Sequence, residues 1–152
     1  MTSTAPQPHI KAFQDWAAWW DALTPDTVDQ LDDLATADLI FADPFNRVEG
    51  TDRLKAILAH MYEAMIEPRF EVIDIAPSLT REGIALMHWR FHGRIKSPSV
   101  ALDFKGCSEI TLSEQGDRVA SHVDYWDSGM QFYGQMPVLG SVIRAIARRM
   151  EQ

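Results

Sequence analysis

The stretch HVDYWD, residues 122–127, holds two side chains that can exchange protons, His122 and Asp124. If it is a β-strand, His122, Asp124 and Trp126 share one face, because successive side chains alternate. In a cavity, a histidine beside a carboxylate gives each group a hydrogen-bond partner and a way to transfer a proton. The same alternation of polar side chains is also common on the solvent-exposed face of a half-buried sheet. The alternate positions are not markedly more apolar, so the pattern leaves both interpretations open.

Asp43 is a third acid/base candidate, because it precedes Pro44 where the strand-like stretch LIFADPF ends. An aspartate in this setting commonly caps a turn. Beside an apolar wall and within reach of a substrate proton, the same side chain could act as a general base. The sequence alone supports both interpretations.

The stretch ALMHWRFHG carries His88, Arg90 and His92 at alternate positions. The other parity, which includes Met87 and Trp89, is the better lining for a cavity, so we expect the two histidines and the arginine on the outer face. The chain has no HExxH and no CxxC motif, and we expect neither a metal site nor a cofactor.

Helical periodicity surrounds these stretches. Apolar residues recur every three or four positions over residues 9–23, which predicts a first helix. Thr24 and Pro25 begin a short second helix, and a third is expected from Thr51 until Pro68 stops it. Helical spacing returns over residues 137–152, where three arginines flank an apolar stripe.

Strand-like segments make up most of the rest. A short strand is expected from Leu39 to the break at Pro44, followed by a turn at NRVEG. Four further strands, separated by turn residues, predict an antiparallel meander over residues 69–76, 84–95, 100–112 and 118–126. The order predicts an α+β fold with its helices on one side of a curved antiparallel sheet. Residues 1–8 are expected to be a flexible terminus, and residues 9–152 a single domain.

Composition narrows the possible partners. Hydrophobic residues make up 46% of the 152 residues, which is enough for a core. The formal charge of −8 argues against nucleic acid as a partner. Cys107 is the lone cysteine and is expected to pack inside a strand, and no apolar run is long enough for a membrane-spanning helix. We therefore expect a cytoplasmic protein without integral membrane association.

The features named so far, in this order, resemble the nuclear transport factor 2-like superfamily. Its members include ketosteroid isomerase, scytalone dehydratase, limonene epoxide hydrolase and the SnoaL-like polyketide cyclases. The stretches ATADLIFADPFNRVEG, leading into a helix, and GCSEITLSEQGDRVASHVDYWD carry the resemblance. It implies a cone-shaped curved antiparallel sheet with the N-terminal helices packed on its concave face, plus a C-terminal helix.

The resemblance implies roles for the acid/base candidates. Asp43 matches the general base of ketosteroid isomerase, and Asp124 matches that of limonene epoxide hydrolase, with His122 facing the same cavity. Where the isomerase has its oxyanion donors, this chain has Trp19 and Ser108. Where the hydrolase has an arginine and an aspartate on its hairpin strand, this chain has the inward-facing residues Met87 and Trp89. The implied pocket is mostly apolar and consists of Trp19, Leu58, Met61, Tyr62, Met87, Trp89, Ser108, Ile110 and Trp126.

The resemblance implies a cofactor-free isomerase, cyclase or dehydratase that acts beside a carbonyl group of a small apolar molecule. Asp43 or Asp124 would move the proton, and His122 would serve as an acid or as the orienting partner. The alternative is a non-catalytic domain that binds a ligand or serves in dimerisation. Dimeric relatives imply a homodimer through the outer sheet face that carries His88, Arg90 and His92.

Overall fold

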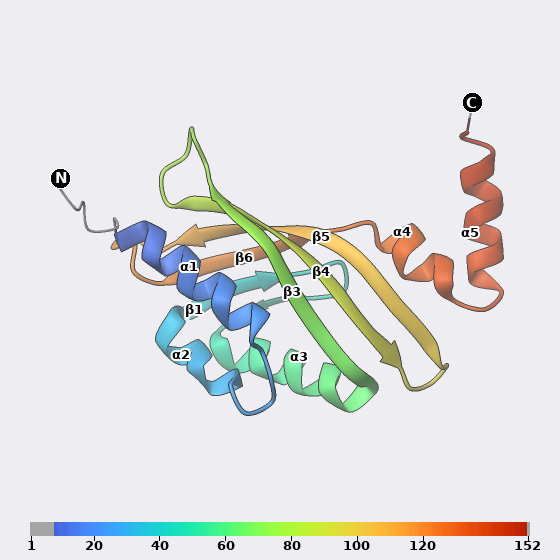
Figure 1. Ribbon diagram of the computed structural model, residues 1–152, viewed down its shortest axis with the longest axis horizontal. Coiled ribbons are helices and arrows are strands. Elements are labelled where there is room, and N and C mark those ends of the chain that lie inside the picture. Colours follow the sequence, from blue (N-terminus) through green and yellow to red (C-terminus); the bar gives the residue numbers. More distant parts are fainter. Residues whose placement is uncertain (1–7, 152) are drawn as a thin grey trace.

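The computed structural model describes residues 8–151 and has its N-terminal helices gathered against one face of a strongly twisted six-stranded sheet (Figure 1). This arrangement confirms the α+β fold. The expected flexible terminus lies almost wholly outside the described residues, since the first helix already begins at Pro8. The helical elements are α1 (Pro8–Asp21), η1 (Val28–Gln30), α2 (Leu31–Leu34), α3 (Thr51–Ala64), α4 (Ser128–Gln131), η2 (Tyr133–Gln135) and α5 (Leu139–Arg148).

The sheet has the strand order β2-β1-β6-β5-β4-β3. The last four strands along the chain form the predicted antiparallel meander, and β1 joins β6 in parallel. Because β1 completes the sheet beside β6, the two stretches that carry the acid/base candidates become neighbours. The strands are β1 (Ala35–Ala42), β2 (Arg47–Glu49), β3 (Met65–Pro77), β4 (Ile84–Ile95), β5 (Val100–Leu112) and β6 (Val119–Tyr125).

Several element boundaries differ from the prediction, and helical structure after α1 resumes at Val28 rather than at Thr24 and Pro25. Strand β1 begins at Ala35 rather than at Leu39, and part of the expected turn NRVEG pairs with it as β2. Helix α3 ends at Ala64, because the chain is already extended at Met65. Pro68 therefore lies within β3 instead of ending a helix. A proline is tolerated there because β3 is an edge strand and its register with β4 shifts at this point.

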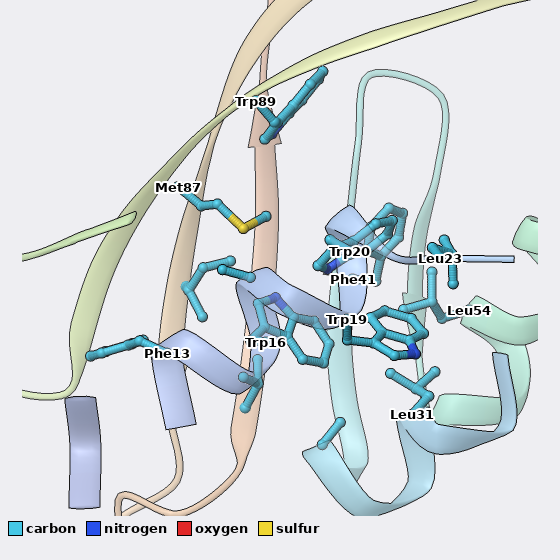
Figure 2. Packing of buried hydrophobic residues seen from close by; sticks show 14 of the residues in the cluster. Phe13, Trp16, Trp19, Trp20, Leu23, Leu31, Phe41, Leu54, Met87 and Trp89 are labelled. Atoms are coloured by element: carbon cyan, nitrogen blue, oxygen red, sulfur yellow. The ribbon is translucent and has the colours of Figure 1, made fainter. Parts of the chain in front are cut away.

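The core lies between the helices and the sheet. Helix α1 presents Trp16, Trp19 and Trp20 to it, and Figure 2 shows them on the same side of the sheet as Met87 and Trp89 of β4. Trp16 has no solvent-exposed surface. Such burial removes the whole indole from water, and truncation of a buried tryptophan typically costs about 3–5 kcal/mol.

Helix α5 lies apart from the sheet (Figure 1). The predicted C-terminal helix is thus present, but its apolar stripe is not buried within the described residues. Ile146 and Met150 are 58% and 80% exposed. In the described part of the chain, the helix packs mainly on η2 and α4.

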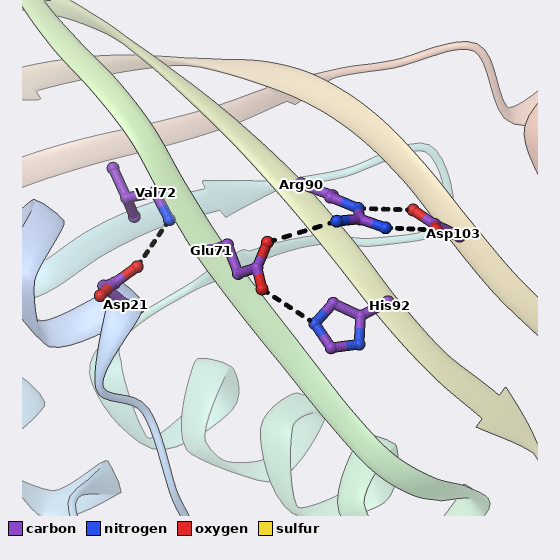
Figure 3. Close-up of polar contacts among 6 residues, drawn as sticks. All are labelled: Asp21, Glu71, Val72, Arg90, His92 and Asp103. Atoms are coloured by element: carbon purple, nitrogen blue, oxygen red, sulfur yellow. Dashed lines mark hydrogen bonds and ion pairs between the residues drawn. The ribbon is translucent and has the colours of Figure 1, made fainter.

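The outer sheet face carries the alternating polar residues of β4. His88 is exposed and Arg90 and His92 are half-buried, whereas Met87 and Trp89 are buried on the inner face, as predicted. Figure 3 shows Arg90 donating two hydrogen bonds to Asp103, at 2.7 and 2.6 Å. The Arg90 guanidinium holds the pKa of the Asp103 carboxyl below its usual value. Nη1 of Arg90 also lies 3.6 Å from Oε2 of Glu71, so ion pairs of Arg90 connect β3, β4 and β5 outside the core. Nε2 of His92 lies 3.4 Å from Oε1 of the same glutamate.

Candidate active site

His122 and Asp124 lie on the inner face of β6 and contact each other. The Nε2 atom of His122 is 2.7 Å from Oδ1 of Asp124, and the two side chains are 2% and 11% exposed. Strand register puts them there: on β5, Ile110 is opposite His122 and Ser108 is opposite Asp124. On the other side of β6, Phe41 of β1 is opposite His122.

A chain of hydrogen bonds fixes both side chains. The Trp16 indole donates to Nδ1 of His122 at 3.0 Å. An indole N–H can only donate, so Nδ1 is the acceptor, and the neutral imidazole carries its proton on Nε2. His122 therefore donates that proton to Asp124.

A second branch of the network reaches Asp124 from β4. Trp89 donates to Oγ of Ser108 at 2.7 Å, and the Ser108 hydroxyl donates to Oδ1 of Asp124 at 2.5 Å. The same carboxylate oxygen thus accepts from both Ser108 and His122. Among residues 8–151, no donor is bonded to the other oxygen, Oδ2. The network orients the carboxylate and leaves one oxygen available.

Asp124 lines a small cavity whose other walls are almost entirely apolar. The volume is about 10 Å³, which is room for roughly one water molecule. Three aromatic rings surround the imidazole of His122, with centroids 5.1 to 5.8 Å away. The lining residues are Trp20, Phe70, Val72, Met87, Trp89, His122 and Asp124.

Some of the predicted pocket residues line this cavity and others do not. Met87 and Trp89 line it, and Ser108 lies behind Asp124 as its hydrogen-bond donor. Trp19 instead donates to the carbonyl of Thr27 at 3.0 Å. The remaining predicted residues belong to the core or pack against it, and these are Leu58, Met61, Tyr62, Ile110 and Trp126.

Three lining residues were not predicted. Phe70 and Val72 alternate along the stretch RFEVIDIA, so their shared inward face was visible in the sequence. Trp20 follows Trp16 by four residues, which puts both on one side of α1. The sequence placed Trp20 in the core stripe, and nothing in the pattern distinguished a wall of a cavity from a core position.

The Asp43 side chain is occupied in the loop between β1 and β2. Its Oδ1 accepts from the backbone N–H groups of Phe45 and Asn46, at 2.8 and 2.6 Å. The Asn46 side-chain amide lies 3.2 Å from both carboxylate oxygens. Asp43 is not among the residues that line the cavity. The structure brings His122 and Asp124 together and gives Asp43 the contacts of a turn-capping residue.

Gly106 leaves room for the Trp89 indole. A Cβ atom at this position would lie 2.5 Å from Cζ2 of Trp89 and 3.0 Å from Cβ of Trp126. We predict that Gly106→Ala displaces the ring, weakens the Trp89 bond to Ser108 and lowers the free energy of unfolding by about 1–3 kcal/mol. Chemical denaturation measures this loss. Gly83→Ala is a useful comparison for the steric effect, because nothing lies within 4 Å of its Cβ position, although its φ of +70° adds backbone strain.

Cys107 reports on the charge of Asp124. Burial, followed by the negative charge of Asp124, raises the pKa of the Cys107 thiol. We predict that Asp124→Asn lowers this pKa, so that more thiolate is present at a given pH and iodoacetamide reacts faster. The measurement is the reaction rate as a function of pH. An unchanged pH curve would contradict an ionised Asp124, and a higher plateau alone would mean greater access to the thiol. Asp103→Asn, on the outer face of the same strand, serves as the control.

Residues 8–151 contain no cluster of three or more His, Cys, Asp or Glu side chains that could hold a metal ion. Nor is any helix in this part of the chain long and apolar enough to cross a membrane.

Comparison with solved structures shows the same fold in several proteins. An LEH-like epoxide hydrolase from M. tuberculosis aligns with a TM-score of 0.65 and 18% identity, covering 94% of this chain and 95% of that protein. A protein assigned to the SnoaL-like polyketide cyclases, from Shewanella putrefaciens CN-32, aligns with a TM-score of 0.66 and 18% identity, covering 82% of this chain and 95% of that protein. A protein with a ketosteroid isomerase-like fold from Catenulispora acidiphila aligns with a TM-score of 0.60 and 17% identity, covering 87% of this chain and 93% of that protein.

Sequence comparison gives the family. No curated protein matches the chain significantly. The family model described as the SnoaL-like domain matches residues 16–128, which runs from Trp16 to just beyond the strand that carries His122 and Asp124. Since the match covers well over half of the chain, the chain belongs to the SnoaL-like domain family, and its fold is the nuclear transport factor 2-like fold.

Proposed function

We propose that this chain is a general-base enzyme, acting without a cofactor, in which Asp124 takes a proton from a carbon beside a carbonyl group of a small, largely apolar molecule. Such a step belongs to isomerase, cyclase or dehydratase chemistry. One observation carries the proposal: Asp124 lines an apolar cavity, two donors hold its Oδ1, and no donor in residues 8–151 is bonded to its Oδ2. A positioned base with an available lone pair, away from bulk water, is what proton abstraction requires.

His122 is proposed to orient Asp124 rather than to act as an acid. Its Nδ1 accepts from Trp16, so a second ring proton would set two N–H groups against each other. With Nδ1 occupied as an acceptor, Nε2 is the ring atom that donates to the carboxylate. Of the two roles that the sequence suggested, the geometry supports that of the orienting partner.

Between the two candidate bases, we propose Asp124. The Asp43 carboxylate accepts hydrogen bonds from two backbone N–H groups and from the Asn46 amide, which supports a role in holding the loop. A base that is already engaged on both oxygens has fewer lone pairs for a substrate proton.

A second candidate function is activation of a water molecule by Asp124, as in a hydrolase. The cavity volume favours it, because there is room for about one water. A larger ligand enters only if wall side chains shift, and the flexible side chain of Met87 is suited to such movement. The M. tuberculosis relative is named as an epoxide hydrolase, which is consistent with this candidate.

Isotope incorporation separates these functions. Cyclohexanone in D2O reports proton abstraction as deuterium at the carbons beside the carbonyl, and cyclohexene oxide in ¹⁸O-water reports water activation as ¹⁸O in the diol. We expect the wild-type protein to catalyse the first reaction and Asp124→Asn to lose it. Only ¹⁸O incorporation would favour the hydrolase. If neither label enters but cyclohexanone raises the melting temperature of both proteins, the chain is a binding domain.

The outer sheet face is proposed to form a homodimer. Besides His88, Arg90 and His92, it exposes apolar side chains, including Leu86 at 48%. We predict a dimeric mass by light scattering and a monomeric one for Leu86→Arg, because a buried unpaired charge opposes association. Leu79→Arg, in the exposed turn between β3 and β4, is the control and should stay dimeric. A monomeric wild-type mass would refute the proposal.

A further inference from the structure

The Trp20 indole N–H is buried without a partner. Trp20 is 3% exposed, and its Nε1 is bonded to no acceptor among the described residues. The indoles of Trp16, Trp19 and Trp89 each donate to an acceptor, at distances of 3.0, 3.0 and 2.7 Å. Buried polar groups in folded proteins are nearly always paired, so an unpaired donor calls for an explanation.

Trp20 lines the same cavity as Asp124. Its ring centroid lies 5.1 Å from that of His122, and Figure 2 shows the side chain extending from α1 on the core side of the sheet. Two residues of the cavity wall therefore have an unpaired polar atom among the described residues: Trp20 has the donor Nε1, and Asp124 has the acceptor Oδ2. The other lining groups are apolar or already bonded within the network.

We propose that Trp20 binds an acceptor oxygen of a neutral ligand in this cavity. An indole N–H donates one hydrogen bond and carries no charge, so it suits a carbonyl or hydroxyl oxygen. The titratable groups that line the cavity are Asp124 and His122, and Nδ1 of His122 already accepts a hydrogen bond from Trp16. A carboxylate or phosphate would meet the Asp124 charge with no cation to offset it. The ligand class is therefore neutral molecules with a carbonyl or hydroxyl oxygen on an apolar frame.

This ligand class refines the function proposed above, and the inference rests on that function because both use the same cavity. It is tested by the indole ¹H–¹⁵N signal of Trp20, assigned by its loss in Trp20→Phe. Cyclohexanone should shift this signal to saturation. Methylenecyclohexane, which has nearly the same shape but no oxygen, and cyclohexanecarboxylate should not. Trp20→Phe should weaken cyclohexanone binding, followed through the Met87 methyl signal, by roughly threefold to tenfold.

Two results overturn the assignment: a Trp20 signal that stays in place up to the solubility limit of cyclohexanone, or one that moves equally with methylenecyclohexane. Failure of the proposed function gives a different result. If the Trp20 signal responds but the wild-type protein exchanges no deuterium into cyclohexanone, Trp20 is a binding residue and Asp124 is not a base. If exchange depends on Asp124 while the Trp20 signal stays unmoved, the function stands and this inference fails.

Discussion

Asp124→Asn is expected to reduce deuterium exchange at the carbons beside the carbonyl of cyclohexanone by about a hundredfold to ten-thousandfold, the usual contribution of a general base. Asn keeps the size of the side chain and can still accept from Ser108 and His122 through its single oxygen. It has no lone pair suited to taking a proton from carbon. The loss should therefore appear in the rate of the chemical step, while cyclohexanone continues to bind.

Asp43→Asn is the matched comparison. The amide oxygen of this variant can take the place of Oδ1 and still accept from the backbone N–H groups of Phe45 and Asn46. Exchange should remain within a few-fold of the wild-type rate. The opposite pattern, with activity lost in Asp43→Asn and kept in Asp124→Asn, would show that Asp43 is the base. A melting temperature for each variant establishes that both remain folded.

Substitution of Trp16 is expected to have the largest effect on stability. Trp16 is fully buried and donates to His122, so Trp16→Ala should lower the free energy of unfolding by about 3–5 kcal/mol. Trp16→Phe keeps most of the apolar volume but leaves Nδ1 of His122 without its donor, a loss of about 1–3 kcal/mol for a buried unsatisfied group. Urea denaturation measures both changes.

Trp20→Phe separates the hydrogen bond from the loss of ring size. It makes the same change one turn along α1, but Nε1 of Trp20 has no partner to lose within the described residues. Trp16→Phe should therefore be the more destabilising of the two. It should also let the His122 proton move between the ring nitrogens, which ¹⁵N chemical shifts of the imidazole detect. Equal stability of the two variants, with an unchanged His122 tautomer, would refute the role given to Trp16.

Much of the fold could be predicted because the hydrophobic periodicity is regular over long segments. The meander from β3 to β6 and the apolar face of α1 follow directly from it. The predicted end of α3 was wrong because Met65 fits the apolar stripe of the helix and the extended strand equally well. Only its backbone, at φ −124° and ψ 156°, identifies it as extended.

The inward face of β6 could not be predicted from alternation, and the structure gives the reason. The register between β5 and β6 shifts between Thr111 and Leu112. Thr111 pairs with Ser121 and Leu112 with Val119, so Ala120 is an extra residue of β6 without a register partner on β5. The extra residue lets Val119 and His122 both be buried although they are an odd number of positions apart. A strict period of two would place them on opposite faces.

The hydrogen-bond network could not be predicted from the sequence either. Its two indole donors come from α1 and β4, while Ser108 on β5 and His122 on β6 each accept one hydrogen bond and donate another, so the network exists only once four elements meet. Resemblance to known relatives suggested Asp124 and Asp43 as alternative bases. It suggested neither Trp16 as the partner of His122 nor Trp20 as an unpaired donor.

The most direct test of the account is a crystal structure of the protein soaked with cyclohexanone. We expect a carbon beside the carbonyl to lie about 3–3.5 Å from Oδ2 of Asp124, the separation expected of reacting atoms. We also expect Oδ1 still to accept from Ser108 and His122. A ketone bound elsewhere with Asp124 untouched, or an Oδ2 atom held by a donor of the protein itself, would contradict the claim that Asp124 is the base of this cavity.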